Sequence, residues 1–184
     1  FFIRVIPECF LSSWNTEKEL LQRKNLPLWD FQNPFFIYFG LMLFFLLLAI
    51  LIGGILGAMC FIVQAFIAVL HLEVVNYIEH YGLVRQKLDN GKFEPTRPHH
   101  SWNANDHASN LLLINLQKHS DHHARPNKKY QHLQSYDADD APQLPFGYPL
   151  MVLLSLIPQF WMKVMNPKVL EWRKRFYPEL QEWS

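Results

Sequence analysis

The residues with the clearest chemical potential lie in the stretch QKHSDHHARP, Gln117 to Pro126, where three imidazoles occupy five positions. Side chains three and four positions apart share one face of a helix, so His119, His122 and His123 would point into a common volume. Neutral imidazole is the commonest metal ligand, and an all-nitrogen donor set suits iron, copper, zinc or nickel better than magnesium or calcium. Asp121 is a candidate acceptor for an imidazole N–H from elsewhere in the site. We therefore predict a transition-metal site, against the alternative of a solvated helix end.

His80 is the natural fourth member of this set. It stands at the end of a long apolar segment, where an ionisable side chain should face the protein interior rather than lipid, with Glu79 beside it at the same boundary. The alternative for His80 is an interfacial histidine that bonds to a carbonyl. His107 would lie about 18 Å along a helix from His119, too far for one compact site. Structural or solvent-facing roles are expected for the other histidines, His71, His99, His100 and His132.

A membrane segment must position these residues. From Phe35 to Leu72 the chain is almost entirely apolar. One straight helix of this length would be roughly 57 Å long, against a hydrocarbon core of roughly 30 Å. We therefore predict a two-span helical hairpin, Pro34 to Gly53 and Ile55 to Leu83, that turns at Gly53-Gly54. Lysines and arginines flank the run on both sides and the turn has none, so both ends are expected to be cytoplasmic.

The remaining sequence predicts shorter elements around this hairpin. Thr16 to Lys24 reads as a polar helix, with Thr16 and Glu19 forming a capping box. Asn90-Gly91 is a strong turn signal between two short segments that could pair. A helix is expected from Asn105 to Ala124, and an interfacial or buried helix from Pro145 to Trp161. The expected fold is all-α, divided into a cytoplasmic or interfacial segment (1–34), the hairpin (35–83) and a cytoplasmic histidine-bearing region (84–184).

Charge and cysteine content exclude some classes of function. The formal net charge is +1 and the basic residues alternate with acidic ones, so no patch for nucleic acid is expected. Cys9 and Cys60 are too far apart in sequence to suggest a thiolate metal site, and we interpret both as structural.

Several stretches resemble one family closely. They are NYIEHYGL (76–83), LQKHSDHHA (116–124), RPHHSWNANDH (97–107) and DDAPQLPFGYPLM (139–151). These stretches and their spacing resemble the integral-membrane alkane 1-monooxygenases, which are histidine-rich di-iron enzymes related to membrane xylene monooxygenases and more distantly to fatty acid desaturases. The resemblance implies a bacterial inner-membrane enzyme that takes electrons from rubredoxin and inserts one atom of O2 into the terminal methyl group of an alkane. It places four histidines on metal positions: His80, His119, His122 and His123.

The sequence departs from the family's pattern in one respect. The family carries two further histidine boxes, His-Glu-x-x-His and Glu-His-x-x-x-His-His, and neither is present among these 184 residues. The four histidines are about half of the number that the family uses for two iron ions. Since the sequence also opens at Phe1 without a methionine, we expect a carboxy-terminal part of a longer enzyme, inactive by itself.

The resemblance also suggests a substrate route and a partner surface. An alkane dissolved in the bilayer could enter a cleft lined by side chains of the second span: Phe61, Gln64, Ala65, Ala68 and Leu72. The alternative is that these are ordinary lipid-facing or helix-packing positions. A basic patch of Arg125, Lys128 and Lys129 follows the histidine cluster and could steer an acidic rubredoxin, although positive-inside topology also demands such residues.

The alternative functions are a xylene-monooxygenase or desaturase-like di-iron enzyme, and a non-catalytic membrane module that binds zinc or another divalent ion.

Overall fold

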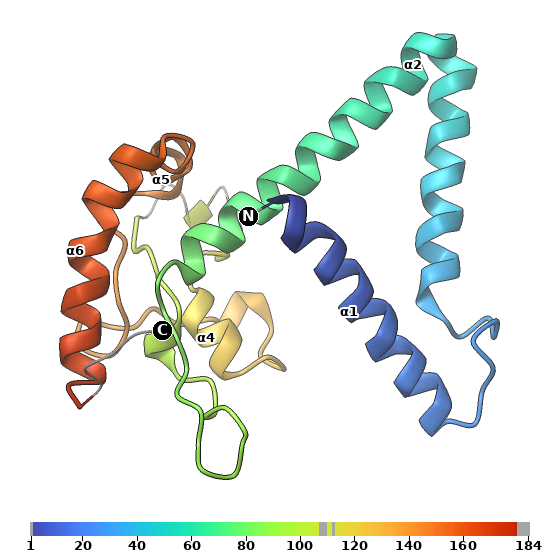
Figure 1. Cartoon of the computed structure of the whole chain (residues 1–184). Coiled ribbons are helices and arrows are strands. Elements are labelled where there is room, and N and C mark those ends of the chain that lie inside the picture. The colour runs from blue at the N-terminus through green and yellow to red at the C-terminus, as the bar shows by residue number, and fades with distance from the viewer. Residues whose placement is uncertain (1, 107–109, 112, 180–184) are drawn as a thin grey trace. The chain divides into compact units, whose positions relative to one another are not determined.

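The computed structural model describes residues 2–106, 110–111 and 113–179, and it divides into two compact units, Phe1–Glu73 and Val74–Ser184. The helical elements follow one another in the order α1 (Phe2–Arg23), α2 (Pro34–His80), η1 (Pro98–His100), α4 (His119–Ala124), η2 (Tyr130–His132), α5 (Tyr148–Ser155) and α6 (Pro158–Phe176) (Figure 1). Among the described residues, extended pairing is limited to two isolated bridges. The predicted all-helical architecture is therefore confirmed.

Helix α1 is longer than the sequence suggested. Thr16 lies inside it and its hydroxyl donates to the carbonyl of Ser12 at 2.9 Å, so the predicted capping box at Thr16 is wrong. The helix ends at Arg23, and Asn25 two residues later has a φ of 56°, a left-handed conformation that asparagine tolerates. There the N–H of Leu26 donates to the carbonyl of Leu21 at 2.9 Å, which satisfies an orphan carbonyl of the last turn.

Helix α2 begins at a strong local signal. The side-chain oxygen of Asn33 accepts a hydrogen bond from the N–H of Phe35 at 3.0 Å, as a helix N-cap does. Pro34 occupies the first helical position, where its missing N–H costs nothing. Aromatic contacts join this start to α1, since the ring centroid of Phe35 lies 5.0 Å from that of Trp14.

The long helix breaks where the sequence predicted a turn. Gly54 has φ 59° and ψ −145°, which is non-helical and open essentially only to glycine. The two arms meet there in a sharp bend (Figure 1). Gly57 lies so close to the other arm that a Cβ atom would sit 2.1 Å from the carbonyl oxygen of Ala49. The glycines at 54 and 57 therefore make the bend possible.

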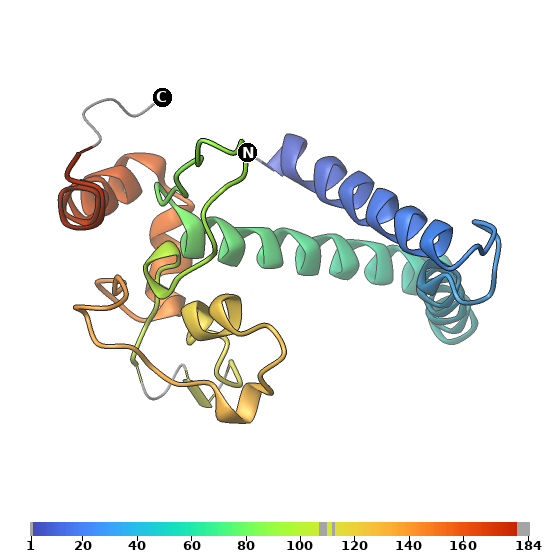
Figure 2. The same cartoon turned by 90° about the horizontal axis from the view of Figure 1, so that it is seen from below.

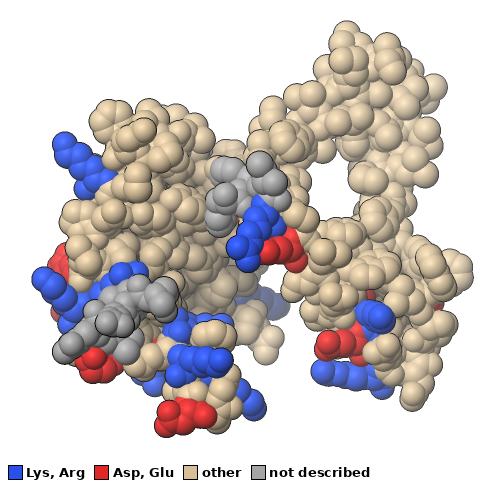
Figure 3. Space-filling model, in the orientation of Figure 1, with Lys and Arg blue, Asp and Glu red and all other residues tan. Residues whose placement is uncertain are grey.

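The surface of both arms is apolar. By length and composition, α2 is a helix able to cross a membrane. Its residues from Pro34 to Leu72 include no Asp, Glu, Lys or Arg, and the face in Figure 3 shows the arms free of charged side chains. Leu51, Ile52 and Ile55 are each at least 80% exposed. Apolar side chains exposed over such a length are typical of contact with lipid.

In the second unit the end of α2 packs against α6. Gly82 follows the helix with φ 68°, and a Cβ at this position would lie 2.7 Å from a methyl carbon of Val169. The rings of Tyr77 and Tyr81 lie 5.4 and 5.2 Å from the ring of Trp161. The largest fully buried side chains described in this unit are Trp161, Tyr148, Ile78, Met151 and Met165. This packing fixes the end of α2 within the unit.

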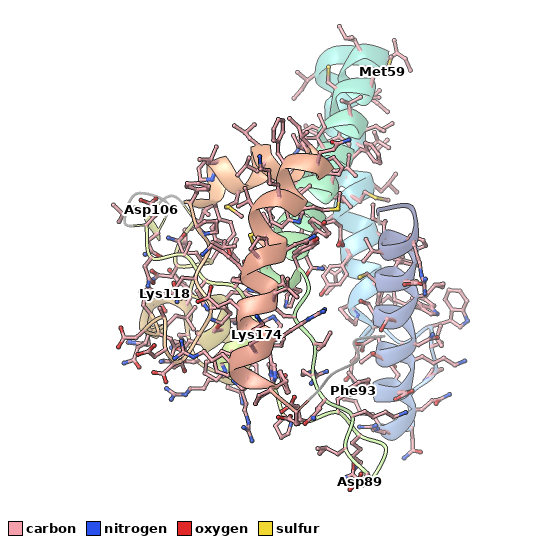
Figure 4. All side chains as sticks on the ribbon, turned by 60° about the vertical axis from the view of Figure 1, so that its left-hand side comes forward. Met59, Asp89, Phe93, Asp106, Lys118 and Lys174 are labelled. Atoms are coloured by element: carbon pink, nitrogen blue, oxygen red, sulfur yellow. The ribbon has the colours of Figure 1, made fainter. Side chains whose placement is uncertain are left out.

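A tight turn follows at the predicted Asn90-Gly91. Gly91 has φ 77°, and Lys87 and Phe93 form an antiparallel bridge across the turn. Figure 4 labels Asp89 and Phe93 in this loop. The predicted pairing of the two short segments is confirmed.

The helix predicted from Asn105 to Ala124 is not continuous. Asn110, Leu111 and α4 are helical, but residues 113–117 form a turn between them. Ile114 and Asn115 have φ values of 53° and 65°, which no right-handed helix contains. His107, which we placed on that helix, lies outside the described residues.

Tertiary hydrogen bonds explain this departure. The side-chain amide of Asn115 donates to the carbonyl of Tyr130 at 3.2 Å. The amide of Gln117, which is fully buried, donates to the carbonyl of Asp106 at 2.7 Å. Such bonds give the backbone an alternative to a helix that periodicity alone does not reveal.

The apolar stretch Pro145 to Trp161 forms two helices instead of the predicted one. Helix α5 ends at Ser155 and α6 begins at Pro158, a residue favoured in the first turn of a helix and unable to continue one. Helix α5 buries Tyr148 and Met151 and exposes Leu150 and Leu153.

Candidate metal centre

The histidines come together from two elements of the second unit. His80 is the last residue of α2, and α4 carries His119, His122 and His123. The views of Figures 1 and 2 agree that α4 lies beside the end of α2. The ring centroid of His80 lies 5.0 Å from that of His119 and 5.2 Å from that of His123.

Two buried polar residues hold α4 in this place. The side-chain carbonyl of Asn103 accepts from the N–H of Ser120 at 3.1 Å, and its amide donates to the Ser120 hydroxyl at 2.5 Å. The Ser120 hydroxyl in turn donates to the carbonyl of Pro98 at 2.6 Å. Because α4 has only six residues, these bonds rather than helix propensity fix its position.

Three of the four predicted ligands converge. One ligand atom each from His80, His119 and His123 lies within 4.8 Å of the others, the spacing of donors around one ion. His122 lies outside that group. Its ring centroid is 6.2 Å from that of His119 and 5.8 Å from that of His123, and its side chain is exposed. His122 therefore lies on the same short helix but outside the converging group.

His80 is oriented as a metal ligand should be. Its Nδ1 lies 2.9 Å from the carbonyl oxygen of Asn76, and a carbonyl only accepts, so Nδ1 carries the proton. The lone pair of the neutral ring is then on Nε2. Metal-binding histidines usually donate their other N–H in this manner.

His119 has no hydrogen-bond partner among the described residues, although both of its ring nitrogens are buried. Burial, followed by the neighbouring His123 and His80, lowers its pKa to about 2. Burial, followed by His80, His122 and Arg85, lowers the pKa of His123 to about 4. Both rings are therefore neutral near pH 7. A buried polar group normally has a partner, so two unpartnered nitrogens in a cluster of neutral imidazoles fit a bound metal cation.

A carboxylate stands behind this cluster. Glu79 is 2% exposed, and its Oε2 lies 3.3 Å from Nε2 of His119, although the two are not aligned as a hydrogen bond. Its Oε1 accepts a hydrogen bond from the hydroxyl of Tyr148 at 2.6 Å. Glu79 thus lies where the sequence placed it, directly beside the histidines.

Asp121 makes different contacts from those that we expected. Its carboxylate accepts hydrogen bonds from Lys128 at 2.6 Å, the N–H of Gln134 at 2.8 Å and the hydroxyl of Tyr136 at 3.0 Å. Burial raises its pKa, but these hydrogen bonds outweigh burial and hold the pKa below its usual range. Asp121 therefore ties the following loop to α4.

The three basic residues predicted to bind a partner differ in exposure because Asp121 holds one of them. Lys128 is held by Asp121 and its side chain is only 19% exposed. Arg125 lies 3.8 Å from the same carboxylate with its side chain 58% exposed, and Lys129 is exposed. Of the three predicted docking residues, Arg125 and Lys129 face solvent.

A half-open cavity of about 220 Å³ adjoins the cluster. His80 and His123 line one part of it, and Arg85, Thr96 and His100 line another. The predicted substrate-channel residues lie in the other unit, on the arm of α2 that follows Gly54. Phe61, Ala65, Ala68 and Leu72 are spaced to share one face of that arm, and Gln64 is exposed beside them.

A second group, Glu94, His99 and His100, also has donor atoms within 4.8 Å of one another. Nδ1 of His100 accepts from the N–H of Arg97 at 2.9 Å, so Nε2 of the neutral ring carries the proton and lacks a free lone pair. That nitrogen lies 2.7 Å from the hydroxyl oxygen of Tyr177, and the hydroxyl donates to Glu94. This group is a closed hydrogen-bond chain, unlike the cluster around His119.

Sequence reasoning missed the residues that position the cluster. Asn103 and Tyr148 lie in stretches that carried the family resemblance, but no periodicity or charge pattern marked their roles. Ser120 stood inside the histidine stretch and was passed over. The sequence signal that could have found them is their position, as polar residues, inside the stretches that resemble the family.

Comparison with known proteins supports the resemblance drawn from the sequence. The family model for fatty acid desaturases matches residues 2–155. Alkane 1-monooxygenase 2 of Pseudomonas aeruginosa is 48% identical over 160 residues, and alkane 1-monooxygenase of Ectopseudomonas oleovorans is 43% identical over 174 residues. These alignments cover 87% and 94% of this chain. The xylene/toluene monooxygenase hydroxylase component XylM of Pseudomonas putida is 32% identical over 161 residues, or 87% of this chain.

The chain spans 42% of the length of each of these three relatives. The match to the desaturase model extends across both units and includes His80 and all of α4. The chain therefore belongs to the fatty acid desaturase family and is homologous to alkane 1-monooxygenases.

Proposed function

We propose that these residues form part of a membrane di-iron monooxygenase that hydroxylates the terminal methyl group of alkanes. The observation that carries the proposal is the convergence of His80, His119 and His123, with His119 buried and unpartnered. The names of the relatives, which are alkane 1-monooxygenases, support the reaction class.

In this proposal His80, His119, His122 and His123 hold iron, and further ligands come from sequence outside these 184 residues. Four imidazoles suit iron as donors, but they are few for the two ions that the family resemblance implies. We therefore expect the 184 residues alone not to hydroxylate alkanes. Bound iron supplies the O2 activation that attack on an unactivated C–H bond requires, and no side chain can replace it.

The chain's own residues orient and shield this site. Hydrogen bonds from Asn103 and Ser120 hold α4 against the end of α2, and Nδ1 of His80 is occupied by the carbonyl of Asn76. The burial of Ile78 and His119 limits the access of water on the protein side. A fixed ligand set that is buried on one side favours reaction with an apolar substrate.

The substrate would reach the centre through the membrane. Phe61, Gln64, Ala65, Ala68 and Leu72 lie on the arm of α2 that leads to His80 along the chain. An alkane partitions into lipid, so we propose that this arm offers it a route of apolar side chains. The exposure of the same arm is equally what lipid contact requires.

We further propose that rubredoxin delivers electrons at the surface beside α4. Arg125 and Lys129 are exposed there, and opposite charges on an acidic donor would speed its encounter. Lys128 contributes less, because Asp121 holds its ammonium group.

The proposed topology is that of a multi-pass protein of the bacterial inner membrane. Residues 35–83 would form two spans that turn at Gly54, with residues 1–34 and 84–184 and the metal site on the cytoplasmic side. The break at Gly54 and the lack of charge from Pro34 to Leu72 support this arrangement.

Two alternatives have support. The 32% identity to XylM supports a xylene-monooxygenase-like enzyme as one alternative, and three converging imidazoles would also suit a non-catalytic zinc site. Metal analysis of the complete protein that contains this sequence, followed by product analysis with octane and with xylene, separates them. We expect about two iron ions per chain and primary alcohol from octane. One tightly held zinc ion without product would contradict the proposal.

A further inference from the structure

Tyr148 and Glu79 form a buried contact next to the candidate ligand His119. The hydroxyl of Tyr148 donates to Oε1 of Glu79 at 2.6 Å, and both residues are only 2% exposed. The other carboxylate oxygen, Oε2, lies 3.3 Å from Nε2 of His119. A tyrosine, a carboxyl group and a candidate ligand therefore lie next to one another in the interior of the second unit, although Oε2 and Nε2 are not aligned as a hydrogen bond.

The three residues come from separate elements. Glu79 is in the last turn of α2, His119 begins α4, and Tyr148 begins α5. Tyr148 is followed by Pro149 within the first turn, and Met151 of the same helix is fully buried. Burial, and then the nearby Glu79, raise the pKa of the Tyr148 hydroxyl well above its usual value, so this group stays protonated and donates.

The geometry gives each oxygen of Glu79 a separate task. A metal-bound imidazole commonly donates its second N–H to a carboxylate, which fixes the tautomer and orientation of the ring. Oε2 is the oxygen that lies near His119, at 3.3 Å from Nε2, and it would make this contact once the ring is turned to bind a metal, whereas Oε1 accepts from Tyr148. Without the hydroxyl, a buried carboxylate oxygen would lose its partner and the side chain would be free to turn away.

We propose that Tyr148 is a positioning residue for the metal site, and that it holds Glu79 in the orientation that supports His119. The inference rests on the proposed function, since it requires His119 to bind iron. It assigns α5 a role in the centre although α5 supplies no ligand.

The test measures how fast Fe²⁺ leaves the complete, iron-loaded protein when a chelator is added in excess. Outer partners of metal ligands typically contribute about 10- to 100-fold in metal affinity. We expect Glu79→Gln to speed iron release by about tenfold or more. Tyr148→Phe should speed it by about threefold or more, because Tyr148 contacts Glu79 rather than the candidate ligand His119. Mössbauer spectra should show altered iron parameters in both variants.

A double variant shows whether Tyr148 acts through Glu79. If it does, Tyr148→Phe should add nothing to the release rate in a Glu79→Gln background, because coupled residues are not additive. Additive effects, or a Tyr148→Phe variant with the wild-type rate and spectrum, would overturn the inference.

The matched control is Tyr177→Phe. Tyr177 is also buried and its hydroxyl also donates to a glutamate, Glu94, but in the group that does not include His119. This variant should keep the wild-type release rate, and faster release from it would overturn the assignment to Tyr148. If Tyr148→Phe does not accumulate in membranes, Glu79→Asp provides the test, because it keeps the carboxyl group and withdraws it from His119. A wild type that holds no iron would overturn both this inference and the proposed function, whereas iron-loaded protein insensitive to these changes overturns the inference alone.

Discussion

At the level of single residues, the histidines differ in which ring nitrogen carries the proton. His80 donates through Nδ1 to a carbonyl and keeps a lone pair on Nε2, whereas His100 accepts through Nδ1 and carries its proton on Nε2. Both belong to groups with donor atoms at metal spacing. Hydrogen-bond direction therefore separates a candidate ligand from a structural imidazole where spacing alone does not.

The first prediction concerns the pH dependence of the His100 group. Burial, and then the neighbouring His99, lower the pKa of His100 to about 4, below the ordinary value of 6.5, while Glu94 opposes this and Arg85 adds to it. The unfolded chain therefore binds a proton that the folded chain excludes, and stability should fall as the pH falls from about 6.5 to about 4. His100→Gln can keep both hydrogen bonds without titrating. Melting temperatures measured in detergent between pH 7.5 and 4.5 should drop more steeply for wild type than for His100→Gln, and parallel curves would contradict the assignment.

The second prediction concerns the two neighbouring lysines. Lys129→Glu should slow association with an acidic rubredoxin by about threefold or more at low salt, because exposed charges steer encounter. Lys128→Glu should instead destabilise the protein, since it would place a second carboxylate against buried Asp121. Stopped-flow association and thermal melting distinguish the two effects, with Lys92→Glu as an exposed control. Equal association rates for Lys129→Glu and Lys92→Glu would count against docking beside α4.

At the level of elements, strong local signals predicted the structure well. Asn33 and Pro34 begin α2, Gly54 breaks it, and Asn90-Gly91 makes a turn, each through chemistry confined to a few neighbouring residues. The helix predicted from Asn105 to Ala124 failed because its polar side chains bond to distant backbone. Periodicity records which residues are apolar, but it does not record which amide will find a carbonyl elsewhere in the fold.

The third prediction tests the packing of α2 against α6. Gly82→Ala should destabilise the protein by about 2 kcal/mol, because its φ of 68° disfavours a side chain and the new methyl would meet Val169. Gly53→Ala serves as the control, since a Cβ there meets nothing within 4 Å. Melting temperature is the readout, and adding Val169→Ala to Gly82→Ala should restore part of the loss. Equal stability of the two single glycine variants would show that the close approach is unimportant.

At the level of the whole molecule, the candidate site could be predicted further than its surroundings. The histidine spacing and the family-like stretches led to His80, His119 and His123, which the structure brings together. The supporting shell of Asn103, Ser120 and Tyr148 depends on how separate elements pack, so no local pattern reveals it.

The fourth prediction concerns topology. Gly53→Cys, made in the complete protein after Cys9 and Cys60 are changed to serine, places one thiol at the bend. Position 53 is preferable to 54, whose backbone conformation excludes a side chain without strain. If the two arms span the membrane from the cytoplasm, a membrane-impermeant maleimide should label this thiol from the periplasmic side. Labelling only after the cytoplasmic face is opened would overturn the two-span hairpin.

The most direct test of the central claim compares two histidines in the complete protein. His123 lies in the converging group, whereas His132 is exposed in η2, outside that group. With expression and membrane insertion confirmed, His123→Ala should lose iron and nearly all conversion of octane to 1-octanol, and His132→Ala should keep most of both. If His123→Ala retains as much iron and activity as His132→Ala, the cluster is not the metal centre.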